Sequence, residues 1–213
     1  LIDIYIINLK NRTDKKIYMI NEMNKHLIDK YKFFNGIKIN KNQIKEFDFI
    51  KPEKFLNNLN INYVLNSAGC KISHYNLIKS IKDNNKYTLI LEDDAVLEKN
   101  FYFYIIHSMK CISDFDILYL GCNLNNKEDA YLVSDNILKV LKPKTTTAYL
   151  IKNSNKNNIL KTIENSTNEI DNCYSDSDLK KYCIYPMVAY QKDLSSDIVS
   201  ESNYEYYHDK FYY

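Results

Sequence analysis

The chain has few of the residues that break or bend the backbone. It holds three glycines and three prolines among 213 residues, and it has no tryptophan. Because glycine is so scarce, we expect Gly36, Gly69 and Gly121 where the backbone needs conformational freedom or close approach. An aromatic surface for a sugar ring would have to come from the 20 tyrosines or 9 phenylalanines. The chain also lacks a glycine-rich phosphate loop.

Neither charge sign dominates, and no long apolar run occurs. The 29 basic and 27 acidic residues leave a net charge of +2, which argues against a nucleic-acid partner because such domains are usually strongly basic. No apolar run approaches the ~20 residues of a membrane span. With 45% hydrophobic residues, the length fits one globular domain over residues 1–213, in which residues 199–213 could form a tail or lid.

The five cysteines are scattered and form no CxxC pair. An odd, dispersed set predicts free thiols rather than a disulfide framework. There is no signal-peptide pattern. We therefore expect this stretch of chain to work in a reducing compartment such as the cytoplasm.

Hydrophobic periodicity predicts strands alternating with helices. The expected strands cover residues 3–9, 31–39, 87–91, 116–120, 139–141, 147–151 and 183–191. The expected helices cover residues 12–27, 67–82, 98–112, 153–164 and 169–182. Thr13 is the expected N-cap of the first helix, and Asn66 or Ser67 that of the second. Residues 41–64 read as irregular with a short helix after Pro52. The alternation predicts an α/β sheet, largely parallel and flanked by helices.

Three consecutive carboxylates, Glu92-Asp93-Asp94, follow the apolar run of residues 87–91. Ligands of open α/β sheets bind beyond the carboxyl ends of the strands. Carboxylates packed together repel one another, and a divalent cation such as Mn²⁺ or Mg²⁺ relieves that repulsion. If the chain stays extended, Glu92 and Asp94 point to one side and Asp93 to the other. The cluster therefore predicts a metal site.

An ordinary acidic turn is the alternative for this cluster, and two other acidic pairs show how common such spacings are. Asp114-Phe115-Asp116 precedes a predicted strand and so lies at the opposite edge of the sheet. Asp176-Ser177-Asp178 falls in a predicted helix and is expected to be solvated. Position at the end of a buried strand separates the triplet from both pairs.

Several segments, in order, resemble glycosyltransferase family 25, which includes bacterial lipooligosaccharide glycosyltransferases and collagen galactosyltransferases. The matching segments together span about residues 4–198. They are residues 4–9 with Arg12 and 14–16, residues 69–74, residues 89–95, residues 146–151, Ile170-Asp171, and residues 185–191 with 196–198. Two features depart from the family pattern. Thr or Ala replaces a glycine before the Tyr-Leu-Ile strand, and residues 41–64 have diverged.

The resemblance implies a GT-A-type, Rossmann-like fold and transfer of a hexose from a UDP-sugar, with Mn²⁺ or Mg²⁺ as cofactor. The acceptor would be a hydroxyl group of a glycan or of collagen hydroxylysine, and the transfer would invert the anomeric centre. Asp171 would be the general base. The expected donor contacts are Asn8, Leu9, Arg12, Lys71, Ser73 and Asp93. The expected metal ligands are Asp94, then Glu92, and His208 as a C-terminal histidine.

Each role has a simpler alternative. Asp171 could serve only as an acidic residue at a helix N-terminus, and Arg12 as a surface arginine. His74 reads as a partly buried histidine that holds a neighbouring loop, and Cys70 and Tyr149 as core residues. For the whole chain, the alternatives are a catalytically degenerate module that scaffolds a larger protein and, with less support, a metal-dependent nucleotidyltransferase.

Overall fold

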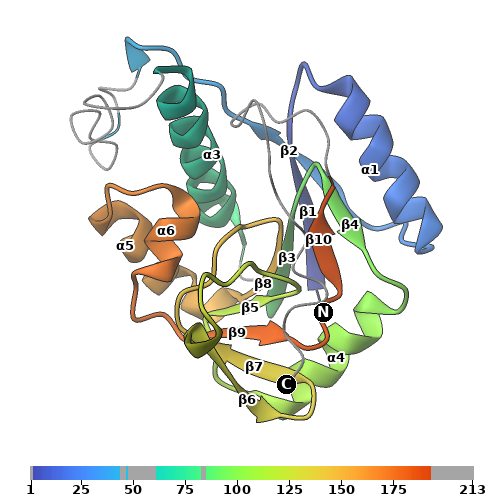
Figure 1. The fold of residues 1–213 in the computed structure, drawn as a ribbon. Helices are drawn as coiled ribbons and strands as arrows, with labels where there is room; N and C mark the ends of the chain where they lie inside the picture. The colour runs from blue at the N-terminus through green and yellow to red at the C-terminus, as the bar shows by residue number, and fades with distance from the viewer. Residues whose placement is uncertain (1, 44–46, 48–60, 83–84, 193–213) are drawn as a thin grey trace.

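The computed structural model describes residues 2–43, 47, 61–82 and 85–192 (Figure 1). The strands are β1 (Ile2–Leu9), β2 (Lys32–Gly36), β3 (Tyr87–Glu92), β4 (Ala95–Leu97), β5 (Ile117–Tyr119), β6 (Ala130–Ser134), β7 (Ile137–Val140), β8 (Ala148–Lys152), β9 (Lys181–Ile184) and β10 (Ala189–Gln191). The helices are α1 (Thr13–Lys25), α3 (Ile61–Ser80), α4 (Phe101–Cys111), α5 (Lys156–Asn165) and α6 (Ile170–Ser175), with short 3-10 turns at Lys127–Asp129 and Asn153–Asn155.

Eight strands form the central sheet in the order β2-β1-β3-β8-β5-β9-β7-β6. Only β8 and β7 run against the direction of the other six strands, because every antiparallel pairing in this sheet involves one of those two. The fold is the expected helix-flanked, mostly parallel Rossmann-like sheet, although its second half is mixed. A separate ribbon pairs β4 with β10.

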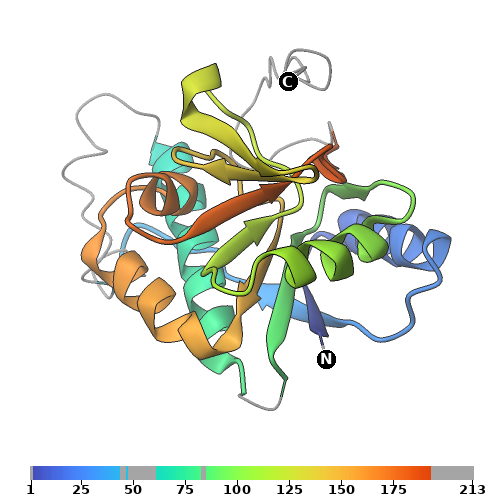
Figure 2. The ribbon, with the colours of Figure 1, turned by 90° about the horizontal axis from the view of Figure 1, so that it is seen from below.

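Helices cover both faces of the sheet, and β3 lies in the middle (Figure 2). On one face Ile90 packs with apolar side chains from α3, α5 and α6. On the other face Leu89 and Leu91 pack with side chains from α1 and α4. Successive side chains of a strand point to opposite faces, so burial on both faces explains why β3 is apolar along its whole length.

Three predictions about helix ends are wrong, and the strand predicted over residues 183–191 is two strands, β9 and β10, in different sheets. Helix α3 begins at Ile61, so Ser67 is a buried interior residue and not an N-cap. Its buried stripe extends toward the N-terminus through Val64, which packs against Ile39. Helix α1 starts at Thr13 itself, and its preceding residue makes no side-chain cap.

The third error concerns the helix predicted over residues 169–182, because α6 ends at Ser175. The buried ammonium of Lys181 donates to the carbonyl oxygens of Tyr174, Ser175 and Ser177 at 2.7, 3.0 and 2.7 Å. Tyr174 and Ser175 are the last two residues of α6 and Ser177 follows it, so the ammonium adds a donor to the carbonyls at the helix end. Residues 181–184 form β9, which pairs with β5 and β7.

The structure also bears on the two expectations about the cysteines and about membrane spans. All five cysteines are free thiols, as their scattered spacing predicts. In the part of the chain that the structure describes, no helix is long and apolar enough to cross a membrane.

Gly121 is needed where β5 passes the chain that leads into β10. The carbonyl of Leu120 accepts hydrogen bonds from the amides of Val188 and Ala189 at 2.8 and 3.2 Å. A Cβ at position 121 would lie 1.9 Å from the carbonyl oxygen of Ala189. No described glycine has a positive φ, so close approach rather than conformational freedom explains this one.

We predict that Gly121→Ala lowers the free energy of unfolding by at least about 2 kcal/mol, because backbone must move to admit the methyl group. Equilibrium unfolding in urea would measure this. Gly36→Ala is the matched control, since its Cβ would meet the mobile end of Leu9 at 3.3 Å, and we expect a change within about 1 kcal/mol. Equal effects of the two substitutions would contradict the packing explanation.

Candidate active site

The acidic triplet lies at the carboxyl end of β3, beside the carboxyl end of β1. Glu92 is the last residue of β3 and pairs in register with Ile7 of β1. Asp93 and Asp94 form a turn, after which β4 begins at Ala95. This is the edge at which open α/β sheets bind ligands, as the sequence predicts.

Asp93 and Asp94 share one buried ammonium group from α1. The Lys15 Nζ lies 3.0 Å from Asp93 Oδ1 and 3.1 Å from Asp94 Oδ2. Burial by itself lowers the pKa of Lys15, but the charges of Asp94 and Asp93 outweigh that effect and raise it. Lys15 therefore stays a cation and supplies positive charge to both carboxylates.

Two further side chains hold these aspartates. The Asn8 amide, at the end of β1, donates to Asp93 Oδ2 at 2.8 Å and to the Arg12 carbonyl at 3.1 Å. The Gln191 amide, from β10, donates to Asp94 Oδ2 at 3.2 Å. The β4–β10 ribbon therefore brings residue 191 to a site about a hundred positions earlier in the chain.

Glu92 is held by different elements from those that hold its two neighbours. Its Oε1 accepts a hydrogen bond from Thr146 Oγ1 at 2.6 Å and lies 3.2 Å from His74 Nε2. Burial raises the pKa of Glu92, but the bonds to His74 and Thr146 outweigh it, and the net shift is downward. The condition under which Glu92 and Asp94 would point to one side is not met, because the chain turns after Glu92 instead of staying extended.

His74 and Tyr149 connect Glu92 to the core. Both side chains are fully buried, and the His74 Nδ1 lies 2.7 Å from the Tyr149 hydroxyl. The alternative interpretation of His74 as a histidine that holds a neighbouring group is the one its contacts support. Tyr149 is a core residue, as expected.

Asp94 offers an oxygen suited to a divalent cation. Asp94 Oδ1 is buried and has no hydrogen-bond partner among the described residues. Burial, then the charge of Glu92, raises the pKa of Asp94 to about 6. Buried polar atoms are rarely left without a partner, and hard cations such as Mn²⁺ and Mg²⁺ prefer carboxylate oxygens. The residues present therefore fit such an ion.

Asp171 lies in the first turn of α6, and the segment after β7 links it to Glu92. The Asp171 carboxylate accepts hydrogen bonds from its neighbour Asn172 at 2.8 Å and from the Thr145 amide. Thr146, the next residue, binds Glu92. Burial is the main reason that the pKa of Asp171 is raised.

Thr145 adopts φ of 71°. A β-branched residue rarely takes this left-handed conformation, which stores strain of about 1–3 kcal/mol. This strain lies in the segment that contacts the carboxylates of both Glu92 and Asp171. Strained backbone is often found at binding sites.

Two of the predicted donor contacts, Lys71 and Ser73, hydrogen-bond to the backbone of neighbouring segments. The Lys71 ammonium donates to the carbonyls of Ser166 and Asn168 at 2.6 and 3.0 Å, which fixes the loop between α5 and α6. Ser73 Oγ donates to the Gly69 carbonyl at 2.6 Å and accepts from the Ile37 amide at 2.8 Å. These bonds tie both side chains to neighbouring backbone, and a donor contact by Lys71 or Ser73 stays a prediction.

Leu9 and Arg12 lie at the turn between β1 and α1, next to Asn8, where a donor contact remains a prediction. The Arg12 amide donates to the Leu9 carbonyl at 2.9 Å. The guanidinium of Arg12 lies 2.8 Å from Asp14 Oδ2 and, as the main cause, lowers the pKa of Asp14 to about 2. His208, Ser196 and Asp197 fall outside the described residues.

Sequence reasoning missed three residues that hold the carboxylates, namely Lys15, Thr146 and Gln191. All three occur in the segments that resemble the family, which was the one available signal. Their sequence separations from the carboxylate partners are 79, 54 and 97 residues. No local periodicity relates residues so far apart.

The mostly parallel sheet, with carboxylates at the carboxyl end of β3, places a candidate site at the edge where open α/β sheets bind ligands. Residues 1–174 match glycosyltransferase family 25, described as LPS biosynthesis protein. The chain belongs to this family of glycosyltransferases. No curated protein matches the chain.

Solved structures resemble the fold only distantly. A197 from STIV is 10% identical, with 90% of this chain and 85% of that chain covered and a TM-score of 0.41. The 4-diphosphocytidyl-2C-methyl-D-erythritol synthase from Anaerococcus prevotii is 11% identical, with 93% and 94% covered and a TM-score of 0.42. A Drosophila beta-1,4-galactosyltransferase 7 complex with manganese, UDP-Gal and xylobiose is 12% identical, with 74% and 51% covered and a TM-score of 0.36. Such low similarity gives no information about substrates.

We predict that the metal-free protein loses stability as Asp94 ionises. A carboxyl group whose folded pKa is raised from 3.8 to about 6 stabilises the fold fully below pH 3.8, and this contribution disappears as the pH rises through about 6. Two pKa units correspond to about 3 kcal/mol at most.

Asp94→Asn removes this contribution and tests the prediction. In the presence of a chelator, the free energy of unfolding of wild type should fall relative to that of Asp94→Asn as the pH rises from 4 to 8. Urea unfolding at several pH values would measure the shift. Parallel stability curves for the two proteins would contradict it.

Proposed function

We propose that the chain is an active, metal-dependent transferase that moves a hexose from a UDP-sugar to a hydroxyl acceptor, with inversion. The acceptor would be a glycan or collagen hydroxylysine. The observation that carries this proposal is the Oδ1 of Asp94, which is buried and has no hydrogen-bond partner among the described residues. It lies beside Asp93 at the carboxyl end of β3, in a chain that belongs to a glycosyltransferase family.

The donor half of the site would comprise the acidic turn and the turn after β1. Asp94 would hold Mn²⁺ or Mg²⁺, with Glu92 and His208 as further proposed ligands, and Asp93 would face the donor ribose. Asn8, Leu9 and Arg12 would line the nucleotide pocket. When bound, the cation would offset the negative charge of the diphosphate.

The acceptor half would lie on the α6 side of the sheet, with Asp171 as general base. An inverting transfer needs a carboxylate near the acceptor hydroxyl, away from the leaving nucleotide. Asp171 comes from α6, whose buried residues pack on the face of the sheet with α3 and α5. Lys15 comes from α1 on the opposite face. The raised pKa of Asp171 favours proton acceptance, because an ideal base has a pKa nearer to the working pH.

Residues 1–213 would act as one catalytic domain, with residues 199–213 as a tail or lid. Sugar donor and acceptor are the partners that membership in a glycosyltransferase family supports. A degenerate binding module with the same fold is the competing hypothesis, and ligand binding separates the two.

We predict that one UDP-sugar, together with Mn²⁺, raises the melting temperature of the protein. A ligand at 100 times its dissociation constant stabilises the native state by about 2.7 kcal/mol, which corresponds to a shift of about 5 °C or more for a domain of this size. Thermal unfolding with a panel of UDP-sugars, with and without Mn²⁺, would measure it.

Asp94→Asn should lose the metal-dependent part of this shift. Asp178→Asn is the matched control, because Asp178 is exposed and belongs to an acidic pair that we do not assign to the site. If wild type shows no metal-dependent shift with any UDP-sugar, the degenerate module is the correct description.

We predict that Asp171→Asn lowers kcat by about 10² to 10⁴-fold, the usual contribution of general-base catalysis. The UDP-sugar-dependent thermal shift should persist, because Asp171 is not part of the proposed donor half. Turnover of the donor found in the thermal-shift panel would measure the effect. Near-wild-type turnover would contradict the general-base role. Asp171 would then act only as an acidic residue at a helix N-terminus, which contributes about 0.3–1 kcal/mol of stability.

A further inference from the structure

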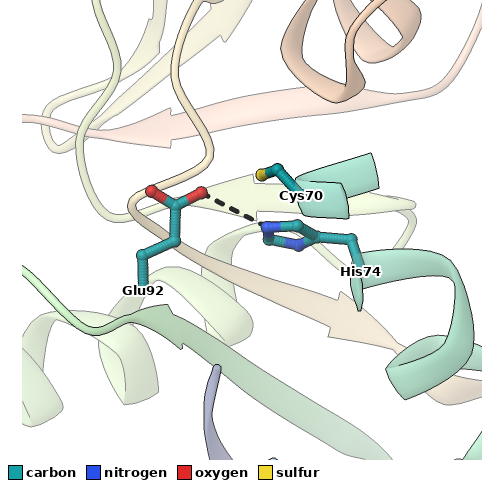
Figure 3. Close-up of side chains that lie close together, drawn as sticks. All are labelled: Cys70, His74 and Glu92. Carbon is teal, nitrogen blue, oxygen red and sulfur yellow. Dashed lines mark hydrogen bonds and ion pairs between the residues drawn. The ribbon is translucent and has the colours of Figure 1, made fainter. Parts of the chain in front are cut away.

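Cys70, His74 and Glu92 form a mixed cluster on the α3 side of the acidic triplet. Cys70 and His74 stand one helical turn apart on α3, and both point toward Glu92 at the end of β3 (Figure 3). One ligand atom from each residue lies within 4.8 Å of the other two. Among the described residues, this is the group of cysteine, histidine and acidic side chains close enough to hold one ion.

We propose that these three residues form a second cation site, which takes a borderline-soft divalent ion such as Zn²⁺. Thiolate, imidazole and carboxylate are the usual zinc ligands, and three protein ligands leave a fourth position for water. Mn²⁺ and Mg²⁺ instead favour oxygen ligands, as Asp94 provides. The softness of the ligands thus separates this site from the proposed donor-metal site.

Neighbouring groups already orient two of the three ligands. The distance of 3.2 Å between His74 Nε2 and Glu92 Oε1 is close to the ~3.4 Å that separates two ligands of a tetrahedral zinc ion at ~2.1 Å. The Tyr149 hydroxyl oxygen lies 2.7 Å from His74 Nδ1, so it can accept a hydrogen bond from Nδ1–H when Nε2 binds a metal. Such second contacts fix the ring orientation of metal-binding histidines. Thr146 holds Glu92 at 2.6 Å.

The charges around the cluster favour a cation. The carboxylates of Glu92, Asp171, Asp94 and Asp93 all act electrostatically on the Cys70 thiol. A bound divalent ion would offset this negative charge, and its binding would release the thiol proton of Cys70 to solvent. Because Glu92 is also a proposed ligand of the donor metal, an ion held here would compete for that carboxylate and so regulate the transferase.

The chain contains a natural comparison on α4. His107 and Cys111 have the same spacing, and Cys111 Sγ lies 3.9 Å from His107 Nε2. Both side chains are exposed, and no third ligand among the described residues joins them. Two exposed ligands bind a metal ion far more weakly than three preorganised ones, so this pair serves as the control.

The test is titration of the reduced, metal-free chain with Co²⁺, a spectroscopic substitute for Zn²⁺. We expect about one equivalent to bind in a tetrahedral, thiolate-containing site, with a sulfur-to-cobalt charge-transfer band that Zn²⁺ abolishes and excess Mn²⁺ does not. Cys70→Ser should remove the band, and Cys111→Ser should retain it. Glu92→Gln should keep the band but weaken Co²⁺ binding at least about tenfold.

Several results would overturn the proposal, namely no charge-transfer band in wild type, a band that survives Cys70→Ser, or a band lost in Cys111→Ser. Thermal unfolding in chelator would verify that each variant is folded, and His74→Gln provides a second ligand deletion. Asp94→Asn separates this proposal from the proposed function, because it should keep the cobalt band while losing the Mn²⁺-dependent response to UDP-sugar.

Discussion

The repulsion among three carboxylates at the end of one buried strand is the constraint on which the rest of the site depends. Three adjacent acids can be packed there only if positive charge and hydrogen-bond donors surround them. Lys15 supplies the positive charge to Asp93 and Asp94, while His74 and Thr146 contact Glu92. These partners come from α1, α3 and the segment before β8, so the site exists only when both layers of helices are packed on the sheet.

The turn after Glu92 divides the triplet into two chemically different halves. Asp93 and Asp94 face an ammonium and two side-chain amides, which donate hydrogen bonds to their carboxylate oxygens. Glu92 faces an imidazole and lies near a thiol. Asp171 joins this second half through the strained Thr145. The same strand end therefore presents two chemically different environments.

Much of the fold and part of the site could be predicted from the sequence. The apolar run of β3, the helix periodicity of α1 and the ordered motifs of family 25 were enough to place Glu92-Asp93-Asp94 at the carboxyl end of a central strand. The start of α3, the end of α6, and the β4–β10 ribbon could not be predicted. Each depends on a contact between distant residues, such as Ile39 with Val64 or Lys181 with the last carbonyls of α6.

By itself, the sequence determined which residues carry charge, which segments are apolar on one or both faces, and to which family the chain belongs. The tertiary structure alone decided what each charged group does. Lys71 and Ser73 lie in a family motif, yet their polar atoms bind backbone carbonyls and an amide, whereas Lys15, to which the sequence analysis assigned no role, bridges two carboxylates. Local spacing encodes the period of a helix or strand, but a side chain's partner is set by the packing of segments many residues apart.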